Sequence, residues 1–210
     1  GRWAKKNKVS KKIGHENGIK NCISICEDLK KLKYNLNELS FYVFSTENWN
    51  RKASEIKNLF SLIEVFYREF ESKADENNLQ IRHYGSRKKL SKKLLKIIDG
   101  ITKKTAKNNG TIINLLFNYG SRQEINDAIL KIRKLKNPSK DFRKYLYIPD
   151  SYDPDLIIRT GGEIRLSNFM LWQSAYAELY FTRVLWPDFN ISNFNIALDD
   201  YIKRRRKHGK

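Results

Sequence analysis

Two arginines flank a pair of glycines directly after a short apolar run. Arg159 and Arg165 lie on either side of Gly161 and Gly162. Guanidinium groups bind phosphate oxygens through several N–H donors, and glycines allow backbone N–H groups to come close to an anion. This stretch therefore predicts a phosphate-binding turn, and the alternative is a tight turn that carries two surface arginines.

A second group of polar side chains lies in segment 45–51, which joins another apolar run to a long helical pattern. It contains a hydroxyl, an amide, an indole and a guanidinium group, on Ser45, Asn48, Trp49 and Arg51. A plain connection would not need a tryptophan at this place. Because ligands of open α/β sheets bind beyond the carboxyl ends of the strands, we expect this segment to face a ligand.

Two further places carry weaker signals. Near the N-terminus, Gly1 and Arg2 precede Gly14 and His15, which open a predicted helix, and such helix entries favour anions. By itself, a histidine at this position is more typical of a helix cap than of a ligand. Glu178 stands among aromatic residues at the start of a predicted strand, where an exposed acid or a buried ion pair explains it as well as a functional role.

These residues need a framework that positions them, and the apolar pattern predicts an α/β fold. Apolar residues recur at helical spacing in five segments, and short apolar runs of strand length alternate with them. The helical patterns run over 19–32, 56–70, 94–101, 125–135 and 194–201, and the strand-like runs are Leu39–Phe44, Leu79–Tyr84, Thr111–Phe117, Leu156–Arg159 and Leu179–Phe181. We therefore predict a single domain with a central, mainly parallel sheet flanked by helices on both faces.

Composition restricts the class of protein further. The 210 residues carry 42 Lys and Arg against 23 Asp and Glu, a net charge of +19, so the expected partners are polyanions. Cys22 and Cys26 follow i,i+4 spacing on an apolar helical stripe, which favours small core residues in a reducing compartment over a disulfide or a metal site. No apolar run of about 18 residues is present, so no transmembrane helix is predicted.

Six stretches stand in a fixed order along nearly the whole chain. They read G-R-W-A-K-K at 1–6 with G-H at 14–15, Y-V-F-S-T-E-N-W-N-R at 42–51, N-Y-G-S-R at 118–122, D-P-D-L-I-I-R-T-G-G-E-I-R-L-S-N-F at 153–169, L-W-Q-S-A-Y-A-E-L-Y-F at 171–181 and L-W-P-D-F at 185–189. In this order they resemble the cis-prenyltransferases, and closely the bacterial undecaprenyl diphosphate synthases. The α/β fold of that family agrees with the fold predicted from the apolar pattern.

The resemblance implies an activity and a set of site residues. Members of the family add isopentenyl diphosphate repeatedly to an allylic diphosphate such as farnesyl diphosphate, and each new double bond is cis. By resemblance, the isopentenyl diphosphate is held by Arg159, Arg165 and Ser167, the catalytic loop contains Ser45, Asn48 and Arg51, and the allylic diphosphate is bound by Gly1, Arg2, Trp3, Lys11, His15 and Trp49. Lys11 stands where the family has an arginine, so the charge is kept but the guanidinium fork is lost.

The resemblance also implies Mg²⁺ as a cofactor, with Glu178 linked to the metal. In the family, the principal metal ligand is the Asp of a D-G-N-G-R-W motif, and this chain begins at the second glycine of that motif. We therefore expect residues 1–210 to be one cis-prenyltransferase domain that lacks its first strand and this Asp. An incomplete chain of this extent should not coordinate Mg²⁺ normally.

Further expectations concern the product and the partners. By resemblance, a product tunnel is lined by Val43, Ile63, Phe66, Leu115 and Phe117, although ordinary core positions explain these residues equally well. The family also implies a homodimer, in which the segments around Glu178 and Trp186 lie near the interface. We expect a cytoplasmic enzyme that makes the undecaprenyl precursor of the cell-wall lipid carrier. Basic residues 204–207 can contact anionic lipid at the inner membrane surface, and a solvated C-terminus is the favoured alternative.

Two alternatives remain open at this point. The first is a catalytically silent subunit of a heteromeric prenyltransferase, although such subunits usually lack the site residues that are present here. The second is a basic nucleic-acid-binding protein, which the charge alone suggests. Because no helix-turn-helix, zinc or RNA-recognition motif is visible, we expect no nucleic-acid partner.

Overall fold

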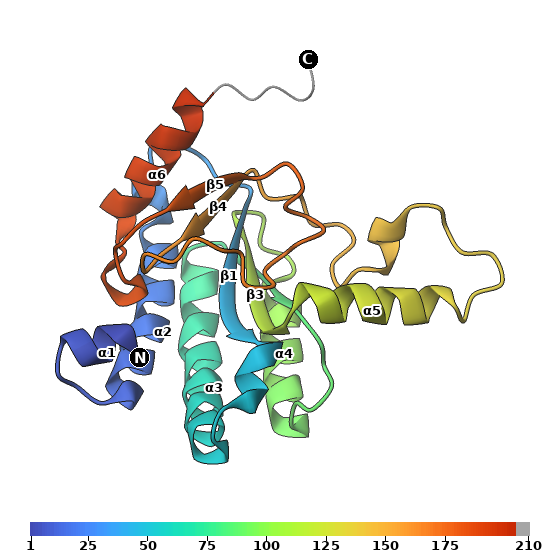
Figure 1. Ribbon diagram of the computed structural model, residues 1–210, viewed down its shortest axis with the longest axis horizontal. Coiled ribbons are helices and arrows are strands. Elements are labelled where there is room, and N and C mark those ends of the chain that lie inside the picture. The colour runs from blue at the N-terminus through green and yellow to red at the C-terminus, as the bar shows by residue number, and fades with distance from the viewer. Residues whose placement is uncertain (205–210) are drawn as a thin grey trace. The chain divides into compact units, whose positions relative to one another are not determined.

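The computed structural model describes residues 1–204 (Figure 1). They form two compact units. The first contains Gly1–Asn35, Pro154–Arg165 and the residues from Tyr176 onward, and the second contains Leu36–Asp153 and Leu166–Ala175. The assignment of residues 1–210 to one domain stays a prediction. Residues 205–207, part of the segment expected to contact a membrane, lie outside the described residues.

The second unit is built on a three-stranded parallel sheet with the order β1-β3-β2. Its strands are β1 (Glu38–Ser45), β2 (Gln80–Tyr84) and β3 (Ile112–Tyr119), and its α-helices are α3 (Ala53–Glu76), α4 (Lys92–Thr105) and α5 (Ser121–Ile132). Two 3₁₀ helices, η2 (Thr46–Asn50) and η3 (Phe142–Tyr145), lie in its connections. Helices α3 and α4 lie side by side, and α4 also contacts β2 (Figure 1).

The central strand β3 explains where the core of this unit lies. It pairs on both sides, so nearly all of its residues are buried, as expected for a central parallel strand. On one face, Phe117 packs in an aromatic cluster with Phe44 and Phe60, the latter from α3. On the other face, Leu116 belongs to a cluster with Tyr84, Tyr119 and Met170.

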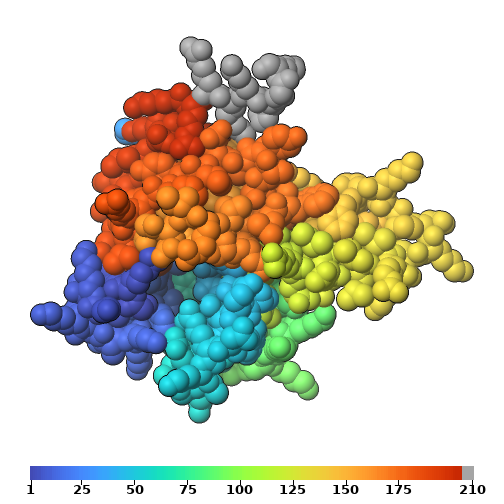
Figure 2. All heavy atoms as spheres, viewed as in Figure 1, coloured from blue at the N-terminus to red at the C-terminus, as the bar shows by residue number. Residues whose placement is uncertain are grey.

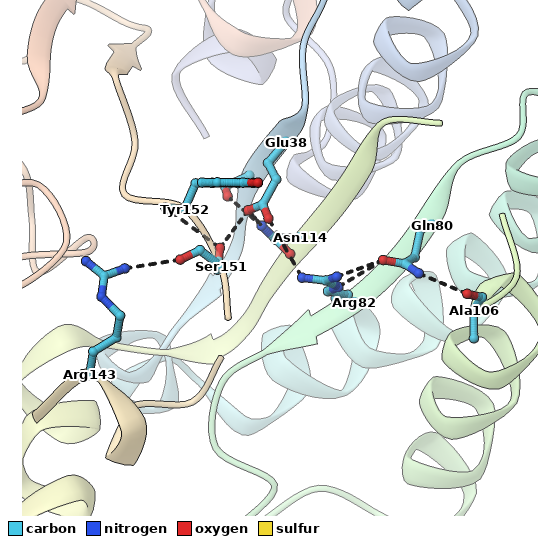
Figure 3. A network of polar contacts seen from close by, with 9 residues as sticks. Glu38, Gln80, Arg82, Ala106, Asn114, Arg143, Ser151 and Tyr152 are labelled. Atoms are coloured by element: carbon cyan, nitrogen blue, oxygen red, sulfur yellow. Dashed lines mark hydrogen bonds and ion pairs between the residues drawn. The ribbon is translucent and has the colours of Figure 1, made fainter. Parts of the chain in front are cut away.

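A polar network lies at the amino ends of these strands (Figure 3). The Glu38 carboxylate accepts hydrogen bonds from Asn114 Nδ2 at 3.0 Å and from Ser151 Oγ at 2.6 Å. Arg82 Nη1 lies 3.7 Å from Glu38 Oε1. Within the described residues, Glu38 Oε1 and Asn114 Oδ1 are buried without a hydrogen-bond donor, so this network is only partly satisfied.

Within residues 1–204, the first unit contains a two-stranded parallel sheet, β4 (Leu156–Arg159) with β5 (Glu178–Phe181), and three α-helices. The helices are α1 (Arg2–Lys6), α2 (Lys11–Glu27) and α6 (Ile191–Lys203), with 3₁₀ helices η1 (Leu29–Lys31) and η4 (Trp186–Asp188). A Cβ atom at Gly14 would lie 2.9 Å from the Ala4 Cβ. Glycine therefore allows α1 to pack closely on α2.

The predicted α/β class with parallel strands is confirmed, but two predicted helices had wrong boundaries. The pattern over 125–135 runs past α5, which ends at Ile132. The apolar pattern over 19–32 predicted a single helix, but α2 begins at Lys11 and ends at Glu27. Its start is set by Ser10, whose hydroxyl accepts from the N–H of Ile13 at 3.3 Å, a polar cap that an apolar pattern does not reveal. The pattern continues past Glu27 into a 3₁₀ helix at Leu29–Lys31.

Both cysteines are core residues, as predicted. Cys22 and Cys26 are buried free thiols on α2, and burial raises the pKa of Cys22 to about 12. Among the described residues, none of the helices is both long and apolar enough to cross a membrane.

Candidate active site

Three arginines of the first unit meet at the glycine turn after β4. Arg2 Nη1 donates to the Gly161 carbonyl and, at 3.2 Å, to Glu163 Oε1. Arg165 Nη1 donates to the other oxygen of the same carboxylate, Glu163 Oε2, at 2.5 Å. Arg159 Nη1 donates to the Arg165 carbonyl at 2.7 Å. Three arginines assigned by resemblance to two different diphosphates therefore meet at one turn.

The two glycines do not act as the sequence suggested. Their backbone N–H groups do not face a ligand, because Gly161 donates to the Val184 carbonyl and Gly162 to the Thr182 carbonyl, each at 2.8 Å. Both glycines have positive φ angles, +87° and +77°, which favour glycine. A Cβ atom at Gly161 would also lie 2.7 Å from Arg2 Nη2, so the missing side chain makes room for a guanidinium rather than for an anion.

Glu163 is the residue of this turn that sequence reasoning missed. Its two carboxylate oxygens each take one guanidinium, from Arg2 and from Arg165. The side chains of these arginines are 57% and 59% exposed, so both can reach an incoming anion. The sequence did contain a signal for this role, because Glu163 is an acid between two candidate phosphate-binding arginines. Guanidinium groups this close together repel one another unless an anion lies between them.

A pocket of about 460 Å³ in the first unit contains three residues assigned to the allylic diphosphate, Gly1, Arg2 and Lys11. Ala4, Lys5 and Val9 complete its lining. The N-terminal segment lies at the surface (Figure 2). Three of the six lining residues, Arg2, Lys5 and Lys11, are basic, while most of the lining surface is apolar.

The other two N-terminal candidates differ in their surroundings. Trp3 Nε1 donates to Asp188 Oδ1 at 2.7 Å, which ties α1 to η4. Trp186 makes a similar tie, from its Nε1 to the Gly18 carbonyl at 2.7 Å. His15 is half-buried on α2, one helical turn beyond Lys11. The structure thus gives Trp3 a packing role that sequence reasoning did not foresee.

In the second unit, Ser45 and Asn48 bond to each other. The Ser45 side chain accepts from the N–H of Asn48, and Asn48 Oδ1 accepts from the N–H of Ser45 at 3.2 Å. This reciprocal capping box begins η2 at the end of β1. It orients both side chains. The capping box by itself also explains why a serine and an asparagine stand at these two positions. Arg51, which follows η2, forms an ion pair with Glu55 at 3.2 Å.

Trp49 lies on the aromatic cluster of the second unit. Its ring centroid is 5.5 Å from that of Phe44 and 5.3 Å from that of Phe60. Its Nε1 donates to Asn118 Oδ1 at 2.7 Å, and Lys89 Nζ lies 5.8 Å from the ring centroid. The indole N–H is therefore used internally, and the ring is the part that can contact a substrate.

The loop that contains Ser167 has an unusual backbone. Ser167, Asn168 and Met170 have positive φ angles of 51°, 64° and 41°, a conformation that costs energy in residues other than glycine. The following stretch is anchored by Gln173, whose Nε2 donates to Tyr84 Oη at 3.0 Å and to Glu124 Oε2 at 3.1 Å. Strain of this kind is common at functional sites.

The candidate tunnel residues form part of the core. Ile63, Phe66, Leu115 and Phe117 are fully buried, and Val43 is half-buried. These positions are consistent with ordinary packing, so a tunnel lined by them stays a prediction.

The described residues do not fit a magnesium site by themselves. Glu178, the residue linked to the metal by resemblance, accepts from Arg204 Nη1 at 2.8 Å. Residues 1–204 contain no group of three or more His, Cys, Asp or Glu side chains that could hold a metal ion. Magnesium prefers several oxygen ligands, and one carboxylate that is already paired with an arginine does not supply them.

The family model for undecaprenyl diphosphate synthases (Prenyltransf) matches residues 1–209. The chain belongs to this family. It is 42% identical to an isoprenyl transferase of Fusobacterium nucleatum and 41% identical to one of Thermotoga maritima, over the whole chain and 91% and 92% of the relatives. The structure is similar to that of lavandulyl diphosphate synthase from Lavandula x intermedia in complex with dimethylallyl diphosphate. The TM-score is 0.92 at 30% identity, covering 100% of this chain and 93% of the other.

The protein is thus a cis-prenyltransferase with the fold of its family. Family membership and relatives named as isoprenyl transferases favour an enzyme over the two alternatives, a silent subunit and a nucleic-acid-binding protein. The arginine turn and the Ser45–Asn48 capping box both lie in stretches that carry the family resemblance.

Proposed function

We propose that this cis-prenyltransferase condenses isopentenyl diphosphate repeatedly with an allylic diphosphate, with farnesyl diphosphate as the primer. In each cycle the allylic C1–O bond breaks and releases inorganic diphosphate. A new bond forms between that carbon and C4 of isopentenyl diphosphate, and a proton leaves C2 to restore a double bond. The product is a cis-polyprenyl diphosphate that serves as the undecaprenyl carrier precursor for cell-wall synthesis.

The observation that carries this proposal is the meeting of Arg2, Arg159 and Arg165 at the turn after β4. Two diphosphates repel each other, by about 4 kcal/mol for each pair of unit charges about 4 Å apart at an effective dielectric near 20. An enzyme that joins two diphosphate esters must therefore supply several fixed cations. A cluster of arginines contributed by distant parts of the sequence meets this requirement.

We assign the site residues to the two diphosphates as the family resemblance implies. Arg159, Arg165 and Ser167 bind isopentenyl diphosphate, and the pocket formed by Gly1, Arg2 and Lys11 binds the allylic diphosphate together with Trp3, His15 and Trp49. Ser45, Asn48 and Arg51 orient the isopentenyl group for attack. Several N–H donors on the departing diphosphate stabilise the charge that develops as the C–O bond breaks.

The proposal includes Mg²⁺ as the metal, with Glu178 as the carboxylate of this chain that approaches it. Because the described residues do not form a magnesium site, we assign no step of the reaction to the ion. Mg²⁺ titration after removal of divalent metal with EDTA tests the assignment. Restoration of activity by Mg²⁺ in the native protein but not in a Glu178→Ala variant supports it, and full activity in EDTA contradicts it.

We further propose a cytoplasmic homodimer that contacts the inner membrane through its basic C-terminal residues. Exposed apolar side chains in the first unit support the dimer, since Ile164 and Tyr176 are 77% and 76% exposed, and large exposed apolar residues often mark interfaces. Sedimentation of the native protein and of a Tyr176→Asp variant tests it. The variant should shift toward monomer, and an unchanged mass would contradict this interface.

The central experiment is product sizing. The protein at its natural length is incubated with labelled isopentenyl diphosphate, farnesyl diphosphate and Mg²⁺, and the prenyl products are separated by the length of their hydrocarbon chains. We expect long cis-polyprenyl diphosphates, and at least about a hundredfold lower kcat/KM after Arg165→Ala, because a charge-assisted bidentate donor to diphosphate is lost. Arg133→Ala, at an exposed arginine on the second unit, is the matched control. An inert native protein, or equal losses in both variants, would contradict the proposal.

A further inference from the structure

The 3₁₀ helix Thr46–Asn50, which contains Asn48, is held by other loops of the second unit. Thr46 lies directly against Gly120 in the turn after β3. A Cβ atom at Gly120 would be 2.3 Å from Thr46 Oγ1 and 2.7 Å from Asn168 Nδ2. Glycine is therefore the residue that allows this turn, the start of η2 and the loop around Asn168 to meet.

Asn168 uses both the nitrogen and the oxygen of its side-chain amide at this meeting point. Its Nδ2 donates to Glu47 Oε1 at 2.7 Å, and its Oδ1 accepts from the backbone N–H of Arg122 at 2.8 Å. Its carbonyl oxygen accepts from the N–H of Ser121 at 2.9 Å. The residue holds a left-handed conformation, as does Ser167 before it. Such strain persists where the surrounding bonds over-determine the backbone.

Glu47 meets Asn168 as a charged acceptor. Burial acts to raise the pKa of Glu47, but hydrogen bonds from its own backbone and from the Asn168, Ser45 and Thr46 side chains outweigh burial and lower that pKa. A hydrogen bond to an ionised acceptor is roughly twice as strong as a neutral one. The donor at position 168 is therefore matched to the charge at position 47.

The far end of η2 is anchored separately. Asn118 accepts the indole N–H of Trp49 and donates through Nδ2 to the carbonyls of Ser86 at 2.8 Å and Lys88 at 2.9 Å. Asn118 is 3% exposed and also has a positive φ of 54°. With Trp49 held in this way, Glu47 is the side chain that ties the near end of η2 to Asn168.

We propose that Asn168 is a positioning residue for the prenyl-transfer reaction. By holding Glu47, it sets the Ser45–Asn48 capping box and keeps it in register with Ser167 in the neighbouring loop. One side chain thus couples the segment that orients the isopentenyl group to the loop assigned to its diphosphate. The inference rests on the proposed function, because the coupled residues receive their roles there.

A closely similar arrangement elsewhere in the same unit provides a matched control. Asn78 also has a positive φ of 54°, donates through Nδ2 to Asn109 Oδ1 at 2.7 Å and accepts from the N–H of Asn109 at 3.2 Å. A Cβ atom at Gly110 would lie 2.4 Å from the Asn78 carbonyl oxygen. Asn78 and Gly110 precede β2 and β3, at the strand ends away from η2. Within residues 1–204, none of the hydrogen bonds of this pair involves an assigned site residue.

The test swaps the hydrogen-bond donor and the charged acceptor between positions 168 and 47. Asn168→Asp places a second carboxylate against Glu47, and the repulsion should displace η2 and lower kcat by at least about tenfold. Glu47→Gln alone keeps an acceptor for Asn168 and should lose little. In the Glu47→Gln/Asn168→Asp double variant, the new amide donates to the new carboxylate, so most of the lost kcat should return. Asn78→Asp should leave kcat unchanged.

The measurements are initial rates at saturating isopentenyl and farnesyl diphosphate, normalised to folded protein by thermal unfolding. A residue that only stabilised the fold would lower the melting temperature without changing kcat of the folded enzyme. An Asn168→Asp enzyme with native kcat, or a double variant no more active than Asn168→Asp, overturns the positioning role. A native protein that forms no prenyl product overturns the proposed function, and this inference with it.

Discussion

The two ends of the three-stranded sheet in the second unit are both polar, but their polar groups bond in different directions. At the amino ends, Asn114 and Ser151 both donate to Glu38, and two buried acceptors there have no donor among the described residues. At the carboxyl ends, Asn118 and Asn168 bond to the segment that carries the proposed catalytic residues.

The two ends of the sheet therefore serve different purposes: the amino end stabilises the fold, and the carboxyl end positions the proposed site residues. The amino-end network joins the starts of β1 and β3 to Ser151 in a connecting segment. Amides that reach from one loop to another fix side chains above the strand ends, where ligands of parallel sheets bind. Backbone strain alone does not distinguish the two ends, because Asn78 at the amino end is as left-handed as Asn118 at the carboxyl end.

The largest effect on stability is expected from disrupting the amino-end network. We expect Glu38→Ala to lower the free energy of unfolding by about 3 kcal/mol, because it leaves Arg82 and Asn114 without their buried acceptor. Urea unfolding measures this loss. The kcat of the folded variant should equal that of the native enzyme, and a large fall in kcat would show that the amino end also serves catalysis. Glu38→Gln, which can donate to Asn114 Oδ1, should be milder.

The opposite result is expected at the carboxyl end. Asn48→Ala should lower kcat about a hundredfold, equivalent to about 2.7 kcal/mol. The free energy of unfolding should fall by only about 1 kcal/mol, since one half of a capping box is lost. Steady-state kinetics combined with urea unfolding separates these effects. A variant that loses stability but retains kcat would assign Asn48 to the cap alone.

The edge strand β2 provides a pH-dependent test through His83. Burial lowers the pKa of His83 to about 4, although its hydrogen bond to the Phe117 carbonyl opposes the shift. In the unfolded chain a histidine has a pKa of about 6.5. As the pH falls below that value, the unfolded chain gains a proton that the folded chain does not.

The native protein should therefore lose about 2 kcal/mol of stability between about pH 7 and about pH 5 through His83. The loss is absent above the unfolded pKa and is complete once the pH falls below the folded pKa. Urea unfolding at both pH values, compared with His83→Gln, isolates it from the carboxylates. Equal pH dependence in the two proteins would contradict this assignment.

The smallest effect is expected at Ser91, which caps α4 after the carboxyl end of β2. Its hydroxyl accepts from the N–H of Leu94 at 3.1 Å. Ser91→Ala should lower the free energy of unfolding by about 1 kcal/mol, with kcat unchanged. A fall in kcat would show that a residue at this end of the sheet can affect the reaction even when it makes no bond to η2.

Much of the framework could be predicted because buried parallel strands appear as continuous apolar runs. The run Leu156–Arg159 coincides with β4, and Leu39–Phe44 lies within β1. The start of α2 could not be found in this way, because its first turns are polar and depend on the Ser10 cap. Local hydrogen bonds of this kind leave no apolar period in the sequence.

The candidate site was predictable in its residue types and less so in their partners. Arg159 and Arg165 were identifiable from their spacing around the glycines, and the structure brings Arg2 to the same turn. The use of the glycine N–H groups by residues after β5, and the bridge formed by Glu163, were not predictable. Each depends on which distant backbone or side chain arrives at the turn.

The sequence by itself determined the alternation of strands and helices, the family, and the residue types that can bind diphosphate. It could do so because apolar period and motif order are properties of neighbouring residues. Only the tertiary structure decided that Arg2 bonds across 159 positions to Gly161, and that Asn168 reaches back to Glu47. A hydrogen bond forms only within about 3 Å and at a narrow range of angles, so its partners are chosen by packing rather than by sequence distance.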